Sequence, residues 1–269
     1  MRITSSVRGL PIIVFAAVSC ALAWTAYAQS SPETVNGQNV SSSSILVELF
    51  TSEACSSCPP ADELLRQLDS HQMINGEQIV VLSEHVDYWD GTGWRDRFSS
   101  RDYTNRQQEY ARRFGISGPY TPQIVVDGRR EFVGNDARLL QSALNEAALK
   151  QKAEVLVSTE EINATEIAVK IKISSLPHSA KRADLYVALA DNIDETHVDG
   201  GENSGRVLRH VAAVRSLLRI AKLGEQGIEK EIRLRIPKPG TPQNLRVVAF
   251  VQEPDNGAVL GAGVKILRR

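Results

Sequence analysis

The chain has 269 residues, of which 42% are hydrophobic and 23% are charged, and its formal net charge is −1. This length suffices for one large domain or two modest ones, and the composition is typical of a globular protein. A nearly neutral chain has no general attraction for polyanions, so nucleic acid and anionic lipid are not expected as partners.

The first 28 residues have the pattern of a secretory signal peptide. Arg2 and Arg8 come before an uncharged apolar run over residues 10–27, and Ala26–Tyr27–Ala28 has the small-x-small form of a cleavage site. An uncleaved membrane anchor is the alternative, although the run is close to the lower length limit for a spanning helix. We expect residues 1–28 to be removed and the mature protein to be exported to the periplasm without a membrane segment.

After a polar leader over residues 29–44, which is expected to be disordered, the sequence predicts the order β-α-β-α-β-β-α up to residue 152. Asp127–Gly128 indicates a hairpin turn between the last two strands. The strands before that turn are predicted at 45–50, 78–89 and 123–126. The helices are predicted from their apolar spacing at 59–73, 103–115 and 135–152.

Residues 153–269 have a different pattern. Several segments of strand length alternate or run apolar, with turn signals between them, which predicts a β-rich module resembling a sandwich. The segment 205–223 is ambiguous between strand and helix. Residues 199–206 are rich in glycine but lack the Lys-Ser/Thr of a phosphate-binding loop, so they predict a turn.

The cysteines are the most informative residues. Signal removal takes away Cys20, so the mature chain keeps only Cys55 and Cys58. A disulfide that closes a loop of about four residues stabilises a protein by only about 2 kcal/mol in the loop-entropy model, which makes a purely structural role a weak explanation. A strand, a Cys-x-x-Cys turn and a helix place the pair at a helix N-terminus, where the partial positive charge favours thiolate. We expect Cys55 to be the nucleophile and Cys58 to resolve the mixed disulfide.

Two further features are candidates for substrate binding. Thr121–Pro122 comes directly before a predicted strand, where a proline is tolerated. A cis bond there would bring the backbone of Thr121 close to the cysteine pair, and an ordinary trans proline is the alternative. Trp89 and Trp94 lie in the loop that follows the second predicted strand and are either contacts for a substrate or packing for that loop.

Several segments carry a resemblance to a known family. "VELFTSEACSSCPPAD", "EHVDYWDGTGWRDRFSSRDYTNRQQEYARRFG", "YTPQIVVDGR" and "GENSGRVLRHVAAVR" are similar to exported bacterial proteins grouped as domain-of-unknown-function family 1223. The N-terminal half also resembles the thioredoxin superfamily. The resemblance implies an α/β fold, with a thioredoxin-like domain at 45–152 followed by the β-rich module at 153–269. It maps the nucleophile onto Cys55, the resolving cysteine onto Cys58 and the cis-proline onto Pro122.

The resemblance has departures that limit what it implies. Ala54 stands where many thioredoxins have tryptophan, and Ser56–Ser57 separates the cysteines, so no redox direction is assigned. Thioredoxins also carry a buried acid on the strand before the pair, for which Glu48 is the candidate. Its spacing to Cys55 is one residue longer, which would place it on the other face of the strand.

These features predict an exported protein that exchanges disulfides with protein partners and needs no cofactor. The alternative is a non-catalytic protein that binds zinc or copper for assembly. In that case His85, near the end of the second predicted strand, would join Cys55 and Cys58 as a ligand. The simpler role for His85 is a hydrogen-bonded support of the sheet end. A third reading is a scaffold in which the cysteines only lock one turn.

Overall fold

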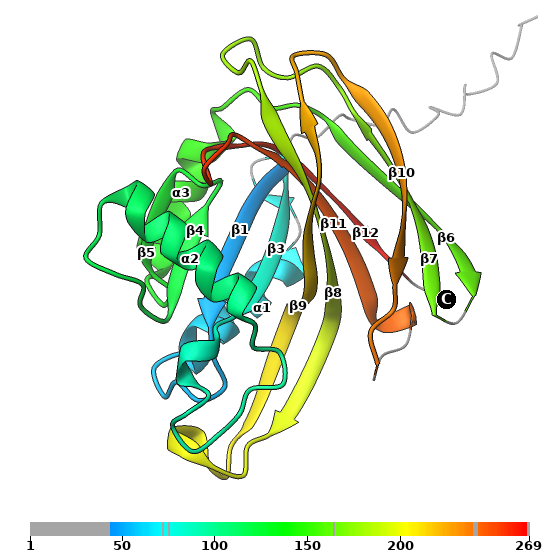
Figure 1. Cartoon of the computed structure of the whole chain (residues 1–269). Helices are drawn as coiled ribbons and strands as arrows, with labels where there is room; N and C mark the ends of the chain where they lie inside the picture. Colours follow the sequence, from blue (N-terminus) through cyan, green and yellow to red (C-terminus); the bar gives the residue numbers. More distant parts are fainter. Residues whose placement is uncertain (1–43, 72, 75, 164, 239–241, 268–269) are drawn as a thin grey trace, which may run out of the picture. The chain divides into compact units, whose positions relative to one another are not determined.

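The computed structural model describes residues 44–267 except 72, 75, 164 and 239–241 (Figure 1). The expected signal peptide at 1–28 therefore lies outside the described residues. The expected leader does too, except that Ser44 already belongs to the first strand.

The first half contains its elements in the predicted order. They are β1 (Ser44–Thr51), α1 (Pro59–His71), β3 (Glu77–His85), α2 (Arg101–Phe114), β4 (Gln123–Val126), β5 (Arg130–Val133) and α3 (Ala137–Ala148). A short β2 (Met73–Ile74) precedes β3, and a 3-10 turn, η1 (Asp87–Trp89), ends the second predicted strand four residues early. Local signals set the helix ends. Ser100 accepts a hydrogen bond from the Asp102 amide at the start of α2, and Gly115 ends that helix with a φ of 68°.

The second half consists of strands, including the segment whose type the sequence left open. They are β6 (Val155–Asn163), β7 (Glu166–Ile173), β8 (Ala183–His197), β9 (Val207–Leu223), β10 (Ile228–Arg235), β11 (Leu245–Gln252) and β12 (Val259–Ile266). Two short 3-10 turns, η2 (Gly201–Asn203) and η3 (Pro242–Asn244), lie between them. β8 and β9 form a long antiparallel hairpin with η2 at its tip.

The predicted fold class is wrong. Strands from both halves form one mixed sheet in the order β12-β11-β8-β9-β3-β1-β4-β5, with β2 added on β3, while β6, β7 and β10 form a second sheet. β1 and β3 are parallel, and β9 joins β3 in parallel with Ser83 opposite Ala213. A thioredoxin-like α/β domain followed by a β-rich module does not describe this arrangement, because β8, β9, β11 and β12 extend the sheet of the first half. Pairing between distant strands leaves no mark in local periodicity, which explains the error.

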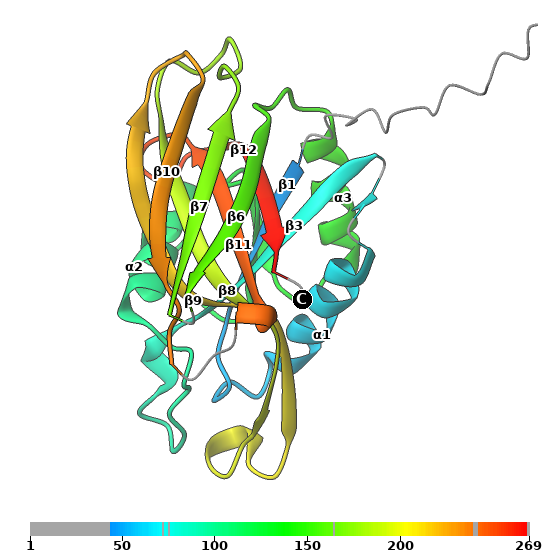
Figure 2. The same ribbon diagram turned by 90° about the vertical axis from the view of Figure 1, so that its right-hand side faces the viewer.

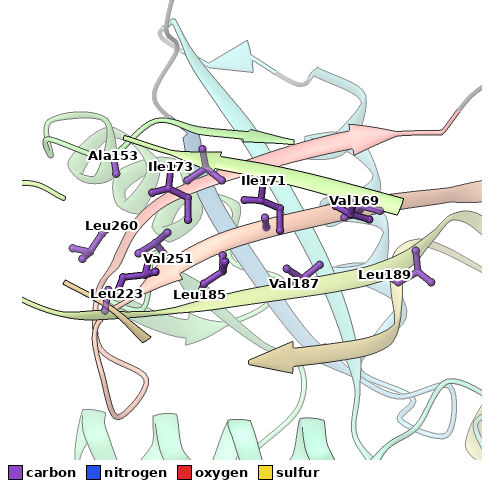
Figure 3. Close-up of a cluster of buried hydrophobic side chains, with 14 of the residues drawn as sticks. Ala153, Val169, Ile171, Ile173, Leu185, Val187, Leu189, Leu223, Val251 and Leu260 are labelled. Carbon is purple, nitrogen blue, oxygen red and sulfur yellow. The ribbon is translucent and has the colours of Figure 1, made fainter. Parts of the chain in front are cut away.

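Other layers cover the two faces of this sheet. The three-stranded sheet β10-β7-β6 packs on β8, β11 and β12 (Figure 2). Ile171 of β7 and Val187 of β8 face each other in that core (Figure 3). At the other end of the sheet, α1 and α3 cover one face of β1, β3 and β4, and α2 covers the opposite face. Among the described residues, no helix is both long enough and apolar enough to cross a bilayer.

Candidate functional site

The cysteine turn, residues 52–58, connects the end of β1 to the start of α1. The Cys55 amide donates to the Ser52 carbonyl, and the Cys58 amide donates to the Cys55 carbonyl. The Cys58 carbonyl then accepts the first bonds of α1, from the amides of Ala61 and Asp62. Pro59 and Pro60 occupy the first turn of α1, where a missing amide hydrogen leaves no bond unmade. The sequence therefore places the pair at a helix N-terminus, as predicted.

Cys55 and Cys58 are joined by a disulfide bond, with 5.4 Å between their Cα atoms. Both cysteines are fully buried, at 0% exposure. An exchange reaction needs an accessible sulfur, so the groups that cover this pair are part of the site.

The Thr121–Pro122 peptide bond is cis, as the sequence suggested. It lies directly beside the cysteine turn, because β4 pairs antiparallel with β1 and Gln123 lies opposite Phe50. The Thr121 hydroxyl donates to Cys55 Sγ at 3.4 Å, and Cys55 Sγ also lies 3.3 Å from the hydroxyl oxygen of Ser57. The structure thus brings the predicted residues Cys55, Cys58, Thr121 and Pro122 together.

The two tryptophans are also at this site. Trp89 Nε1 donates to the Thr121 hydroxyl at 2.8 Å, and Trp94 Nε1 donates to Glu53 Oε2 at 2.8 Å. Each indole is half-buried and bonds to a residue that touches the cysteine turn or belongs to it. Their predicted contact with a substrate stays a prediction.

The tip of the β8–β9 hairpin, which we call the cap (residues 198–206), covers the cysteine turn. Asn203 is fully buried, and its side-chain amide donates to the carbonyls of Glu53 and Cys55, each at 2.9 Å. Glu202 accepts a bond from the Ser56 amide at 3.1 Å. The sequence predicted this turn but not its place at the site, because the residues that it contacts lie about 150 positions away. The only local signal in the cap is a cluster of glycines around two polar side chains, Glu202 and Asn203.

Glu48 lies in a different environment. Its carboxylate is buried and accepts bonds from Arg106 Nε and the Tyr110 hydroxyl, each at 2.6 Å. Residues 46, 48 and 50 of β1 face α2, whereas residues 45, 47 and 49 face α1 and α3. These contacts favour a structural role for Glu48, in the buried ion pair with Arg106.

His85 is buried at the end of β3, and both of its ring nitrogens have partners. Nδ1 pairs with Asp96 at 2.7 Å, and Nε2 lies 3.2 Å from the Ser83 hydroxyl. Burial by itself lowers the pKa of His85, but the charge and hydrogen bond of Asp96 outweigh it, so this pKa is raised. Within the described ranges, no three His, Cys, Asp or Glu side chains gather as a metal site would require. The contacts of His85 match the simpler role, support of the sheet end.

A group of buried ionisable residues lies around His85, and sequence reasoning did not single out most of it. Glu53 Oε1 is 3.4 Å from His210 Nε2, without the alignment of a hydrogen bond. The ring centroids of His85 and His210 are 4.8 Å apart. Burial raises the pKa of Asp62 on α1, while the charges of His210 and His85 oppose that rise. This polar group therefore reaches from the sheet ends to the first turn of α1, next to Cys58.

The chain is similar to several solved structures. An X-ray crystal structure of a protein from Agrobacterium tumefaciens has a TM-score of 0.66 and 26% identity, over 85% of this chain and 96% of that one. A domain of the outer membrane lipoprotein Omp28 from Porphyromonas gingivalis covers 44% of this chain and 89% of its own, at 15% identity and a TM-score of 0.28, too low to carry an argument. No curated protein matches the sequence.

The family described as "Protein of unknown function (DUF1223)" matches residues 46–252. That range begins in β1 and ends with β11, so it contains the cysteine turn, the cis-proline and the cap. Because the match spans more than half of the chain, the protein belongs to the DUF1223 family.

Proposed function

We propose that the protein is an exported thiol–disulfide exchange protein that acts on disulfides of protein partners. The observation that carries this proposal is the position of Cys55. Its sulfur accepts a bond from Thr121, the residue before the cis-proline, and it lies one turn ahead of the N-terminus of α1. The signal pattern in residues 1–28 supports export.

The reaction starts from the reduced protein. The Cys55 thiolate attacks one sulfur of the partner's disulfide, forming a mixed disulfide, and the other partner sulfur leaves as a thiolate and takes up a proton. Cys58 loses its proton and attacks Cys55 Sγ, which forms the Cys55–Cys58 bond and releases the second partner thiol. The protein gives up two electrons and the partner gains them, so no cofactor is needed. The reverse sequence oxidises a partner dithiol.

Three features assist these steps. The dipole of α1 places partial positive charge at the helix N-terminus, near the pair, which favours a thiolate there. The Thr121 hydroxyl donates toward the sulfur that carries charge, and the Trp89 indole orients that hydroxyl. A partner backbone at Thr121–Pro122 would bring its disulfide to Cys55.

The test is to trap the mixed disulfide. Cys58→Ala protein, reduced and mixed with insulin, is expected to form a covalent adduct on non-reducing gels, and dithiothreitol should release it. Cys55→Ala protein is the matched control, because it keeps one thiol in the same turn and should trap far less. Equal trapping by the two variants, or none by either, would contradict the assignment of Cys55 as nucleophile.

The reduction potential separates exchange from a structural lock. An exchange protein is expected to have a potential above about −300 mV, because structural disulfides of secreted proteins have potentials below about that value. The wild-type protein is equilibrated in glutathione buffers, and its free thiols are counted. A lower potential, together with no insulin reduction, would support a cysteine pair that only locks the turn.

A further inference from the structure

The burial of both cysteines conflicts with exchange unless something moves. Cys55 and Cys58 have 0% exposure, and Asn203 of the cap is equally buried above them. The covering segment comes from the hairpin of β8 and β9, whose tip extends past the ends of the neighbouring strands (Figures 1 and 2). The part of the cover that touches the cysteine turn is therefore the far end of a long two-stranded arm.

We propose that the cap (residues 198–206) occupies the place of a substrate polypeptide on the cysteine turn and must leave before Cys55 can react. This inference rests on the proposed exchange function. It adds the substrate class, an extended polypeptide segment that carries the disulfide, and it adds the residues that control access, Glu202 and Asn203.

The chemistry of the contact supports a polypeptide as the competing ligand. The cap binds main-chain groups of the cysteine turn: the Ser56 amide and the carbonyls of Glu53 and Cys55. Asn203 supplies an amide donor, and Glu202 supplies an oxygen acceptor. A polypeptide main chain offers the same two kinds of group, N–H and C=O, so two of its N–H groups and one C=O can replace the three bonds of the cap side chains.

The cap is built to separate from the turn. Two backbone hydrogen bonds join residues of the cap to each other: the Val198 amide donates to the Arg206 carbonyl, and the Gly205 amide donates to the Val198 carbonyl. Because these bonds need no partner outside the cap, the cap can move as a unit. Gly201 and Gly205 have φ values of 69° and 81°, which a side chain would disfavour. The Glu202 contact is exposed, where water can replace it.

The cap also rests closely on the loop after β3. A Cβ atom added to Gly200 would lie 2.4 Å from the carbonyl oxygen of Gly93, and one added to Gly201 would lie 3.1 Å from the Trp94 Cβ. Neither glycine has a side chain to contribute to this contact. Closure therefore brings the cap backbone against the Gly93 carbonyl and the Trp94 side chain, while the hydrogen bonds of Glu202 and Asn203 hold the closed state.

The first experiment measures access with a small reagent and needs no partner. Oxidised wild-type protein, the double variant Glu202→Ala/Asn203→Ala and the control Asp199→Ala, an exposed acid in the same cap, are treated with dithiothreitol. We expect the double variant to be reduced at least about tenfold faster, because three hydrogen bonds that hold the cap are lost, and Asp199→Ala to match wild type. Equal rates for wild type and a folded double variant would overturn the proposal that the cap controls access to the disulfide.

Hydrogen exchange on the wild-type protein keeps the test independent of variant folding. The amide of Ser56, whose acceptor Glu202 leaves with the cap, is expected to exchange much faster than the amides in the middle of β8, whereas the Val198 and Gly205 amides keep their partners within the cap. Protection of the Ser56 amide equal to that of β8 would overturn the proposal.

A third measurement tests the substrate class. A disulfide-linked extended peptide and the same peptide with N-methylated amides beside its cysteine are given to the reduced protein. The first is expected to react several-fold faster, since only it can replace the Asn203 donor. Equal rates would overturn the polypeptide assignment. A further outcome separates the two proposals. If no peptide disulfide reacts with any variant, but dithiothreitol still reduces the double variant faster than wild type, the exchange function is contradicted and the control of access by the cap is supported.

Discussion

The Thr121 hydroxyl lies 3.4 Å from Cys55 Sγ, although the two residues are 66 positions apart. Antiparallel pairing of β1 and β4 causes this proximity. The end of β1 leads into the cysteine turn, and the start of β4 follows the cis-proline, so both connections leave the sheet at the same edge. We expect the same hydroxyl to donate to the Cys55 thiolate once the disulfide is reduced.

Thr121→Val tests that contact. The variant keeps a branched side chain of similar size but removes the donor, and a net hydrogen bond is worth about 1 kcal/mol. The reduced variant is expected to react with iodoacetamide several-fold more slowly at pH 7. Thr121→Ser keeps the hydroxyl and should retain most of the wild-type rate. If Val and Ser behave alike, the hydroxyl does not act on the sulfur.

Arg106 provides a prediction about stability. Its guanidinium is buried, bonds Glu48 at 2.6 Å and lies 3.6 Å from Glu84 Oε1. Burial and the nearby Glu48 raise the pKa of Glu84, so the guanidinium mainly balances Glu48. Arg106→Met is expected to lower the free energy of unfolding by about 3–5 kcal/mol, because it leaves the buried charge of Glu48 unpaired.

The control for Arg106 is an exposed ion pair. Arg66 pairs with Glu63 one turn earlier in α1, and both side chains are about half exposed. Arg66→Ala should change the free energy of unfolding by less than about 1 kcal/mol. Urea denaturation of both variants makes the comparison, and similar losses would show that burial of Arg106 is not the cause.

The site was more predictable from sequence than the fold. The strand, the Cys-x-x-Cys turn, the helix and the cis-proline before the third strand all have local signals, so Cys55, Cys58, Thr121 and Pro122 were found. Glu48 could be doubted from its spacing alone, because a shift of one residue changes the face of a strand. Asn203 could not be assigned to the site, since no local pattern links it to the cysteine turn.

The error in fold class has a similar cause. Residues 153–269 were correctly predicted to be rich in strands, yet β9 also pairs with β3, β11 with β8 and β10 with β7, and these partners are not consecutive in the sequence. Within the sheet, the two halves are joined by a short parallel contact of β3 with β9, at Ser83 and Ala213. Next to it Ala212 has a φ of 51°, a backbone conformation that the sequence does not reveal.

The continuous sheet predicts cooperative unfolding. In a chain without residues 1–28, which contain Trp24, tryptophan fluorescence reports on Trp89 and Trp94 in the first half. Far-ultraviolet circular dichroism reports mainly on the strands. Both are expected to give the same urea midpoint. Ile171→Ala, in the fully buried core between β7 and β8, should lower both midpoints together. The expected loss in the free energy of unfolding is about 2–5 kcal/mol. Two separate transitions would indicate two independent folding units.

Asp62 gives a prediction that depends on pH. Burial raises its pKa above the usual 3.8, and its Oδ1 has no hydrogen-bond partner among the described residues. For an acid with a raised pKa in the folded state, ionisation destabilises the fold. The cost is absent below about pH 3.8, the unfolded value, and complete above the raised folded value.

Asp62→Asn is therefore expected to be more stable than wild type at pH 7, by about 1–3 kcal/mol, because the amide keeps the shape of the side chain but carries no charge that burial would penalise. The difference should shrink toward zero as the pH falls below about 4. Glu63→Gln is the neighbouring control, and it is expected to lower stability at pH 7 instead of raising it. Its bond with Arg66 lowers the pKa of Glu63 to about 2, so the folded protein favours the charged form. Urea midpoints at pH 7 and pH 4 make the measurement. A less stable Asp62→Asn at pH 7 would mean that the charges of His85 and His210 outweigh burial and keep Asp62 ionised beside Cys58.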